Sequence, residues 1–207
     1  MARIKSAIPL KVAFIGNSLT QGYYATSEAN RFSNRVLARV KATQNAVMYN
    51  HGVAGAKVAD HIAWNTAAKV NAECPDICII ELGTNDLSAN DLVAFRANMT
   101  TLISSIRAPR IVLVTTWGPD REAYDAVIKD IAAAKGCLVA DIYSIHHNNW
   151  AANTTGSTDN WHPNDTGHLN IATVIFNVIQ PFIADGARGI LSRIKIARQK
   201  TASRKLS

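Results

Sequence analysis

The chain of 207 residues carries a formal net charge of +7, and 48% of its residues are hydrophobic. This length and composition are sufficient for one globular domain with a sizeable core and require no second domain. The most apolar segment, residues 171–183, is interrupted by Asn177, Gln180 and Pro181. It therefore predicts a core helix and excludes a bilayer-spanning helix of about 18 apolar residues.

The excess positive charge is confined to the C-terminal end. Seven of the 22 basic residues follow Asp185, where there is no acidic residue, and the other 15 balance the 15 acidic residues of the chain. We therefore expect one domain over residues 1–185 and a basic tail over residues 186–207. Aliphatic residues recur among the basic ones in the tail, which predicts a short amphipathic helix that contacts an anionic surface such as lipid or nucleic acid. A solvated extension is the alternative, and the domain itself gives no sign of specific nucleic-acid recognition.

The N-terminus and the cysteines bear on the cellular compartment. Residues 1–6 are basic, but the apolar run after them is too short for a signal peptide and no cleavage site is clear. We therefore expect a protein that is cytoplasmic at synthesis. The three cysteines, Cys74, Cys78 and Cys137, show no metal-type spacing, which predicts reduced thiols packed in or near strands.

Short β-branched apolar runs alternate with longer segments of helical spacing through most of the domain. Because the runs are apolar on both faces, they predict parallel strands that are covered on both sides. The expected fold is an α/β protein, a three-layer α/β/α sandwich around a five-strand parallel sheet in the flavodoxin-like order 2-1-3-4-5. The strands are expected at 12–15, 46–49, 77–82, 111–115 and 137–142, and the helices at 33–43, 56–71, 90–106, 121–135 and 164–184.

A polar stretch over residues 143–161 follows the last expected strand and predicts a long loop. It leads to the sequence Asp159-Asn160-Trp161-His162-Pro163. Proline disfavours a helical conformation in the residue before it, so His162 is expected just ahead of the last helix, with Asn164 or Asp165 as the helix cap.

Several polar residues follow the carboxyl ends of the expected strands, which lie along one edge of a parallel sheet. Ser18 is the candidate nucleophile, because acyl transfer by a hydroxyl needs a base, a group that orients the base, and donors for the oxyanion. His162 is the candidate base, and Asp159, three residues earlier, is the candidate partner for its other ring nitrogen. The candidate oxyanion donors are the backbone N–H groups of Ser18 and Gly55 and the carboxamide of Asn85.

Other interpretations of the same residues stay open at this point. Asn85 and Gly55 also suit ordinary turns, and His168, at the start of a helix, is more typical of a packing residue than of a second base. Asp159, His162, Asp165 and His168 have the residue types of a metal site, but Pro163 breaks the helix that would align them, so we expect no metal.

Four blocks of the sequence resemble, in order and spacing, those of the SGNH or GDSL hydrolases. They are Gly16-Asn17-Ser18-Leu19, Asn50-His51-Gly52-Val53-Ala54-Gly55, Gly83-Thr84-Asn85-Asp86 and Asp159-Asn160-Trp161-His162. The resemblance extends over about residues 11–168. It implies that Ser18 is the nucleophile, that Gly55 and Asn85 are oxyanion donors, and that His162 is the base, with Asp159 orienting it. The first block departs from the usual Gly-Asp-Ser-Leu, because Asn17 replaces the aspartate and removes a charge beside the nucleophile.

The resemblance implies a serine esterase, for which we expect no cofactor. Trp117 and Trp161 are expected to border the crevice and bind substrate, because amphipathic rings suit a sugar ring; sealing loops onto the core is the alternative role. We therefore expect hydrolysis of small acyl esters through an acyl-enzyme, with an O-acetylated carbohydrate as the substrate. The alternatives are a thioesterase or lysophospholipase with the same residues, and a non-catalytic glycan-binding module.

Overall fold

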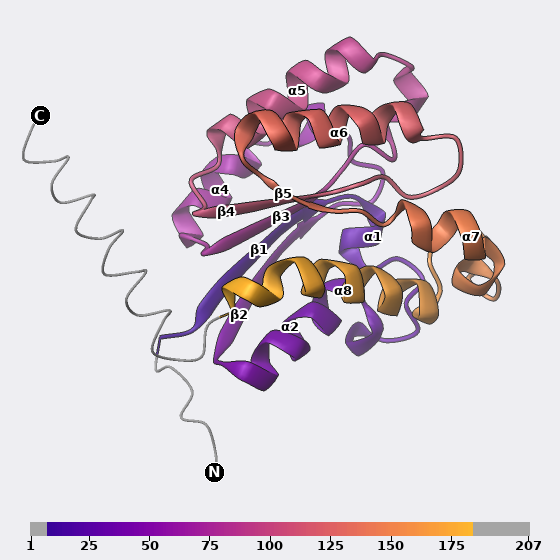
Figure 1. The fold of residues 1–207 in the computed structure, drawn as a ribbon, viewed down its shortest axis with the longest axis horizontal. Helices are drawn as coiled ribbons and strands as arrows, with labels where there is room; N and C mark the ends of the chain where they lie inside the picture. The colour runs from indigo at the N-terminus through magenta and orange to yellow at the C-terminus, as the bar shows by residue number, and fades with distance from the viewer. Residues whose placement is uncertain (1–7, 184–207) are drawn as a thin grey trace, which may run out of the picture.

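The structure, a computed structural model, describes residues 8–183. The expected basic tail over residues 186–207, with its amphipathic helix, lies outside the described residues. Residues 8–183 form strands and helices that alternate around a single sheet (Figure 1).

Five parallel strands form the sheet in the order β2-β1-β3-β4-β5, which confirms the expected topology. The central strands are buried almost throughout, the pattern of a parallel sheet that is covered on both faces. The strands are β1 (Leu10–Gly16), β2 (Ala46–Gly52), β3 (Ile77–Glu81), β4 (Arg110–Val114) and β5 (Leu138–Ala140).

Helices cover both faces of this sheet, so the molecule has the expected three layers (Figure 1). One face is covered by α2 (Phe32–Thr43) and α8 (Asp165–Ile179). The other face is covered by α4 (Thr66–Glu73), α5 (Leu92–Ser105) and α6 (Glu122–Lys135), together with the short α3 (Val58–Ala63).

The core is divided by the sheet into two apolar clusters. Val12 and Phe14 of β1 pack in the cluster under α2 and α8, whereas Ala13 and Ile15 pack in the cluster under the other helices. Successive side chains of a strand point to opposite faces, so one apolar strand supplies both clusters. This two-sided packing fixes the position of β1, and therefore of the residues that follow it.

The helix expected over residues 56–71 is two helices, α3 and α4. The break occurs at Asn65, whose φ of +52° is in the left-handed region. Near the break, the buried imidazole of His61 bonds the Thr66 hydroxyl at 3.1 Å and the Gly16 carbonyl at 3.0 Å. The bend thus links α3 and α4 to the end of β1, a tertiary requirement that helical periodicity does not show.

The prediction of a long loop over residues 143–161 is wrong for most of that range. Residues 143–154 form a helix, α7 (Tyr143–Thr154), with a kink at Asn149. The polar side chains that indicated a loop bond within the structure instead. Asn153 is buried and donates to the carbonyls of Ile145 and Asn149, and it accepts a hydrogen bond from Asn170 of α8. The expected cap of α8 is confirmed, since the Asn164 side chain accepts from the Gly167 N–H.

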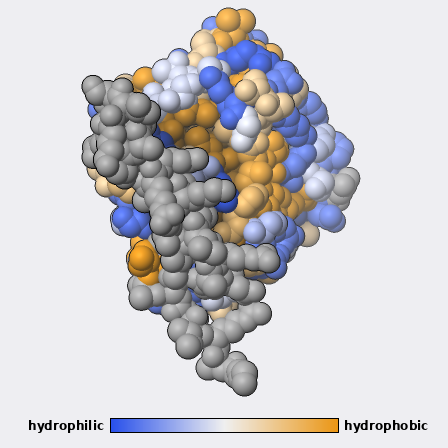
Figure 2. Space-filling model, turned by 60° about the vertical axis from the view of Figure 1, so that its left-hand side comes forward, coloured by the Kyte–Doolittle hydropathy of each residue, from blue (hydrophilic) through white to orange (hydrophobic). Residues whose placement is uncertain are grey.

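The polar loops and an apolar surface lie on opposite sides of the molecule. Figure 2 brings forward the left-hand side of Figure 1, where the strands begin, and shows apolar residues in the middle of that face. The carboxyl ends of the strands point away from it, toward α1 (Ser18–Gln21) and α7. Within residues 8–183, no helix is both long enough and apolar enough to cross a membrane.

His168 of α8 has the packing role expected for it. Its fully buried ring accepts the Phe32 N–H at Nδ1 (3.3 Å) and donates from Nε2 to the Tyr23 carbonyl (3.0 Å). Burial lowers the pKa of His168 to about 4, although the bond to Tyr23 acts in the opposite direction. The neutral imidazole therefore joins α8 to the start of α2 and to the segment that follows α1.

This buried histidine predicts a pH dependence of stability. The unfolded chain takes up a proton on His168 near pH 6.5 and the folded chain only near pH 4, so the stability it contributes is complete above pH 6.5 and is lost as the pH falls toward 4. We expect the free energy of unfolding to fall by about 2–3 kcal/mol more between pH 7 and pH 4 than in His168→Gln, which has no titrating ring. Urea denaturation of both proteins checks this, and parallel pH profiles would contradict it.

Candidate active site

Ser18 lies at the carboxyl edge of the sheet, two residues after β1 ends at Gly16. Asn17 caps the short helix α1, because its side chain accepts the Leu19 N–H at 2.9 Å. Gly22 ends this helix with a φ of +93°. Ser18 is therefore the first residue of a single helical turn, where backbone N–H groups have no acceptor within the helix.

Gly16 allows this turn to pack tightly against the sheet. A Cβ at Gly16 would lie 2.0 Å from Thr20 Oγ1 and 2.7 Å from the Glu81 carbonyl oxygen. Any side chain at position 16 would push the Ser18 turn away from β3, so the glycine fixes the height of the serine above the sheet.

His162 lies just ahead of α8, where Pro163 and the cap Asn164 end the preceding segment. Its Nε2 is 3.0 Å from Ser18 Oγ, and its Nδ1 is 2.6 Å from Asp159 Oδ2. Nδ1–H donates a hydrogen bond to the carboxylate, which fixes this tautomer and leaves the Nε2 lone pair directed at the serine hydroxyl. The structure thus brings Ser18, His162 and Asp159 into one hydrogen-bonded chain.

Asp159 is held by three N–H groups. Its Oδ1 accepts the backbone N–H groups of Trp161 and His162 at 3.0 and 2.9 Å, in addition to the ring bond from His162. Burial alone would raise the pKa of this carboxyl, but the hydrogen bonds from His162 and Trp161 outweigh it and lower the pKa to about 2. Asp159 is therefore an anion at every pH at which an imidazole can act as a base.

Three aromatic rings surround the His162 ring. The ring centroids of Tyr23, Tyr24 and Trp161 lie 5.4, 5.2 and 4.9 Å from its own. Tyr24 has a φ of +57°, so the backbone after α1 bends sharply at this point. The rings restrict the orientation of the imidazole in addition to its bond with Asp159.

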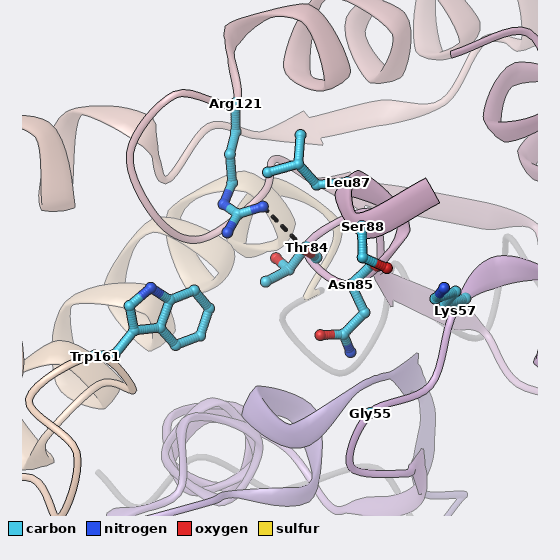
Figure 3. Close-up of a pocket in the computed structure, with 8 residues that line it drawn as sticks. All are labelled: Gly55, Lys57, Thr84, Asn85, Leu87, Ser88, Arg121 and Trp161. Atoms are coloured by element: carbon cyan, nitrogen blue, oxygen red, sulfur yellow. Dashed lines mark hydrogen bonds between the residues drawn. The ribbon is translucent and has the colours of Figure 1, made fainter. Parts of the chain in front are cut away.

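A pocket of about 410 Å³ lies next to this hydrogen-bonded chain, because its wall includes Trp161, whose ring contacts the His162 ring. Figure 3 shows the residues that line the pocket. The pocket contains two of the expected oxyanion donors: Gly55 lies on its wall, and the Asn85 carboxamide points toward the Gly55 loop. Asn85 Nδ2 donates to the Ala56 carbonyl at 3.0 Å, which fixes the carboxamide. The pocket is lined by Gly55, Lys57, Thr84, Asn85, Leu87, Ser88, Arg121 and Trp161.

Gly55 is exposed and has a φ of +78°, a conformation that L side chains rarely adopt. A Cβ built at this position would meet no atom within 4 Å. The space beside its backbone is thus open, and the missing side chain leaves room for a ligand to approach the main chain.

Trp117 is not among the residues that line the pocket, although the sequence predicted that it borders the crevice. Its side chain is fully buried, its Nε1 donates to the Trp161 carbonyl at 2.9 Å, and its backbone N–H donates to Thr84 Oγ1 at 3.0 Å. With no exposed face, Trp117 instead supports two residues of the pocket wall. Trp161 lines the pocket as expected.

Arg121 and Lys57 line the pocket, although sequence reasoning did not select them. Arg121 donates to the Thr84 carbonyl at 3.0 Å, and its guanidinium lies 5.6 Å from the Trp161 ring centroid (Figure 3). Burial lowers the pKa of Arg121, against the effect of Asp125 and other neighbours. The sequence indicated a pocket position for Arg121 only through its place after a turn at the carboxyl end of a strand.

Comparison with solved structures finds the same fold in several esterases. A lipase/acylhydrolase from Enterococcus faecalis has a TM-score of 0.71 at 23% identity, with 83% of this chain and 96% of that chain covered. An acetylxylan esterase from Geobacillus stearothermophilus has a TM-score of 0.67 at 22% identity, covering 86% and 96%. A two-domain esterase active on acetylated mannans has a TM-score of 0.71 at 24% identity, and this chain spans 49% of its length.

Comparison with curated protein sequences found no match. At 22–24% identity, the solved structures establish the fold alone. The family model of GDSL-like lipases and acylhydrolases, however, matches residues 14–169, which include the Ser18 turn, both pocket loops and His162. The chain therefore belongs to the GDSL-like lipase/acylhydrolase family.

Proposed function

We propose that the protein is a serine esterase that hydrolyses small acyl esters through an acyl-enzyme, and that its substrate is an O-acetylated carbohydrate. The observation that carries the proposal is the chain of hydrogen bonds from Ser18 Oγ to His162 Nε2 (3.0 Å) and from His162 Nδ1 to Asp159 (2.6 Å). This is the arrangement in which an imidazole activates a hydroxyl and a carboxylate fixes the tautomer of the imidazole.

In the first half of the reaction, Ser18 Oγ attacks the ester carbonyl while His162 Nε2 takes the hydroxyl proton. The ionised Asp159 stabilises the imidazolium that forms. The imidazolium then gives its proton to the leaving alcohol oxygen as the bond between that oxygen and the acyl carbon breaks. Water attacks the acyl-serine in the second half, with His162 again acting as base and then as acid, and Ser18 is regenerated with release of the carboxylic acid.

Charge develops on the carbonyl oxygen in both halves of the reaction. In this proposal the N–H groups of Ser18 and Gly55 and the carboxamide of Asn85 donate to that oxygen. The open space beside Gly55 and the Asn85 carboxamide that the Ala56 carbonyl holds in place support this assignment. Donors that are already oriented require no reorganisation during the reaction.

Two observations support a carbohydrate acetate as the substrate. The pocket combines an aromatic ring, Trp161, with hydrogen-bonding residues such as Thr84, Ser88 and Arg121, a lining that suits a sugar better than a long acyl chain. Two proteins of the same fold are described as active on acetylated mannans and as an acetylxylan esterase.

The nucleophile is tested directly by substitution. We expect Ser18→Ala to lower kcat for p-nitrophenyl acetate by about 10³-fold or more, because the substitution removes the attacking oxygen. Ser104→Ala, at an exposed position of α5, is the matched control and should retain full activity. Mass spectrometry after treatment with an organophosphate should place the adduct on Ser18. Full activity of Ser18→Ala would contradict the assignment, and an unlabelled, inactive wild type would favour a glycan-binding module.

The oxyanion donor Asn85 predicts a second kinetic effect. Asn85→Ala should lower kcat by about 10² to 10³-fold with little change in KM, since its bond strengthens only as the charge forms. Ser88→Ala alters the same pocket without removing a proposed donor and should change kcat only a few-fold. An unchanged kcat in Asn85→Ala would remove this residue from the proposed oxyanion hole.

The substrate class is tested with a panel of esters. We expect kcat/KM to be highest for acetylated xylo- and manno-oligosaccharides, and to fall by about 10-fold or more from p-nitrophenyl acetate to the octanoate, because Leu87 and Trp161 are the only large apolar side chains among the eight residues that line the pocket. A preference for octanoyl esters, acyl thioesters or lysophospholipids would instead indicate the thioesterase or lysophospholipase alternative.

A further inference from the structure

Glu81 is a buried carboxyl group directly beneath the Ser18 turn. It is the last residue of β3, is only 1% exposed, and neither lines the pocket nor belongs to the chain from Ser18 to Asp159. Its Oε1 accepts from Asn17 Nδ2 and its Oε2 from Thr20 Oγ1, both at 2.9 Å. One carboxyl group thus binds the residue before Ser18 and a residue two positions after it.

Asn17 uses both ends of its carboxamide in this arrangement. The oxygen accepts the Leu19 N–H at 2.9 Å, and the nitrogen donates to Glu81. An ionised aspartate at this position could accept from Leu19 but would have no hydrogen to donate. It would place a second carboxylate at hydrogen-bond distance from Glu81 in a fully buried position. Asn17, where this chain departs from Gly-Asp-Ser-Leu, therefore complements Glu81: its amide supplies the hydrogen-bond donor that the Glu81 carboxylate accepts.

We infer that Glu81 is a positioning residue for Ser18, and that it acts by holding the turn through an amide at position 17 and the hydroxyl at position 20. The inference rests on the proposed function, because the position of Ser18 matters for activity only if its hydroxyl is the nucleophile. A nucleophile misplaced by about 1 Å loses roughly 10²-fold in rate. The position of this turn, which sets the position of Ser18 Oγ, therefore affects the rate of hydrolysis.

The groups described next to Glu81 carry no charge, so the hydrogen bonds from Asn17 and Thr20 are what stabilise its carboxylate. Its partners in the sheet register are Gly16 of β1 and Val114 of β4, neither of which titrates. His61 of α3, whose ring bonds the Gly16 carbonyl, has a pKa that burial lowers, and it is neutral at neutral pH. Burial raises the pKa of Glu81 to about 7, against the hydrogen bonds from Thr20 and Asn17. In its acid form, Glu81 can donate to Thr20 Oγ1 while still accepting from Asn17, so both forms hold the turn.

The test exchanges the polarity of the pair. Asn17→Asp should lower kcat at pH 9, the alkaline end of the profile, by about 10 to 100-fold with KM little changed, because the two buried carboxylates repel and the turn shifts. Glu81→Gln alone should change kcat by less than about 3-fold, since its amide, like the acid form of Glu81, accepts from Asn17 and donates to Thr20 Oγ1. In the double variant Asn17→Asp/Glu81→Gln, the amide introduced at position 81 donates to the carboxylate introduced at position 17 and accepts from Thr20. We therefore expect kcat to rise at least about 10-fold above that of Asn17→Asp.

A pH profile separates positioning from a general loss of packing. The ratio of kcat in Asn17→Asp to that of the wild type should rise as the pH falls from 9 to 6, because one carboxyl then takes a proton and donates to the other. The double variant should show no such rise. Glu73→Gln, which alters a carboxylate bonded to His51 away from the Ser18 turn, is the charge-matched control and should keep the wild-type profile.

The outcomes are distinguishable from failure of the proposed function. If the wild type hydrolyses p-nitrophenyl acetate and the double variant is no better than Asn17→Asp at pH 9, or Asn17→Asp is fully active at pH 9, the inference on Glu81 is wrong. If the wild type is neither active nor labelled at Ser18, the proposed function fails. In that case the Asn17–Glu81 interaction is tested by urea denaturation alone. The double variant must have a higher free energy of unfolding than Asn17→Asp, and an equal or lower value would contradict the inference.

Discussion

The parallel register of β1 with its two neighbours is the constraint on which the site depends. Gly16, the last residue of β1, pairs with Gly52 at the end of β2 and with Glu81 at the end of β3. The three strands therefore end at the same level of the sheet, and the Ser18 turn, the Gly55 loop and the Asn85 loop begin side by side. Parallel pairing with right-handed crossovers makes this alignment a property of the fold, so each loop needs only a short path to the pocket.

The polar groups at this edge are fixed mostly by hydrogen bonds to residues distant in the sequence. The Asn17 and Thr20 side chains bond Glu81, Asn85 bonds Ala56, and Trp117 bonds Trp161. Such bonds inside a protein are costly to leave unmade, which makes each of them a restraint on geometry as well as a source of stability. The Ser18 turn and the pocket residues Asn85 and Trp161 are thereby oriented by residues that do not line the pocket themselves.

Sequence reasoning could predict the sheet order and the residues that meet at its edge, because strand ends and turn residues leave local signals. The apolar runs identify β1 to β5, and the polar residues after them include Ser18 and Asn85. It could not predict α7, whose Asn153 satisfies its amide groups inside the structure, nor the break at Asn65. The same limit applies to Trp117, because an amphipathic ring after a strand suits a pocket wall and a buried support equally well.

The position of His162 in the chain has a consequence for synthesis and truncation. Ser18 and His162 are 144 residues apart, and His162 is placed by α8, the last long helix of the described region. In the proposed mechanism, a nascent chain that has completed β1 to β5 carries its serine without a general base. Hydrolysis therefore begins only when α8 docks against α2 and α7, and ester turnover reports that the C-terminal part of the domain has folded.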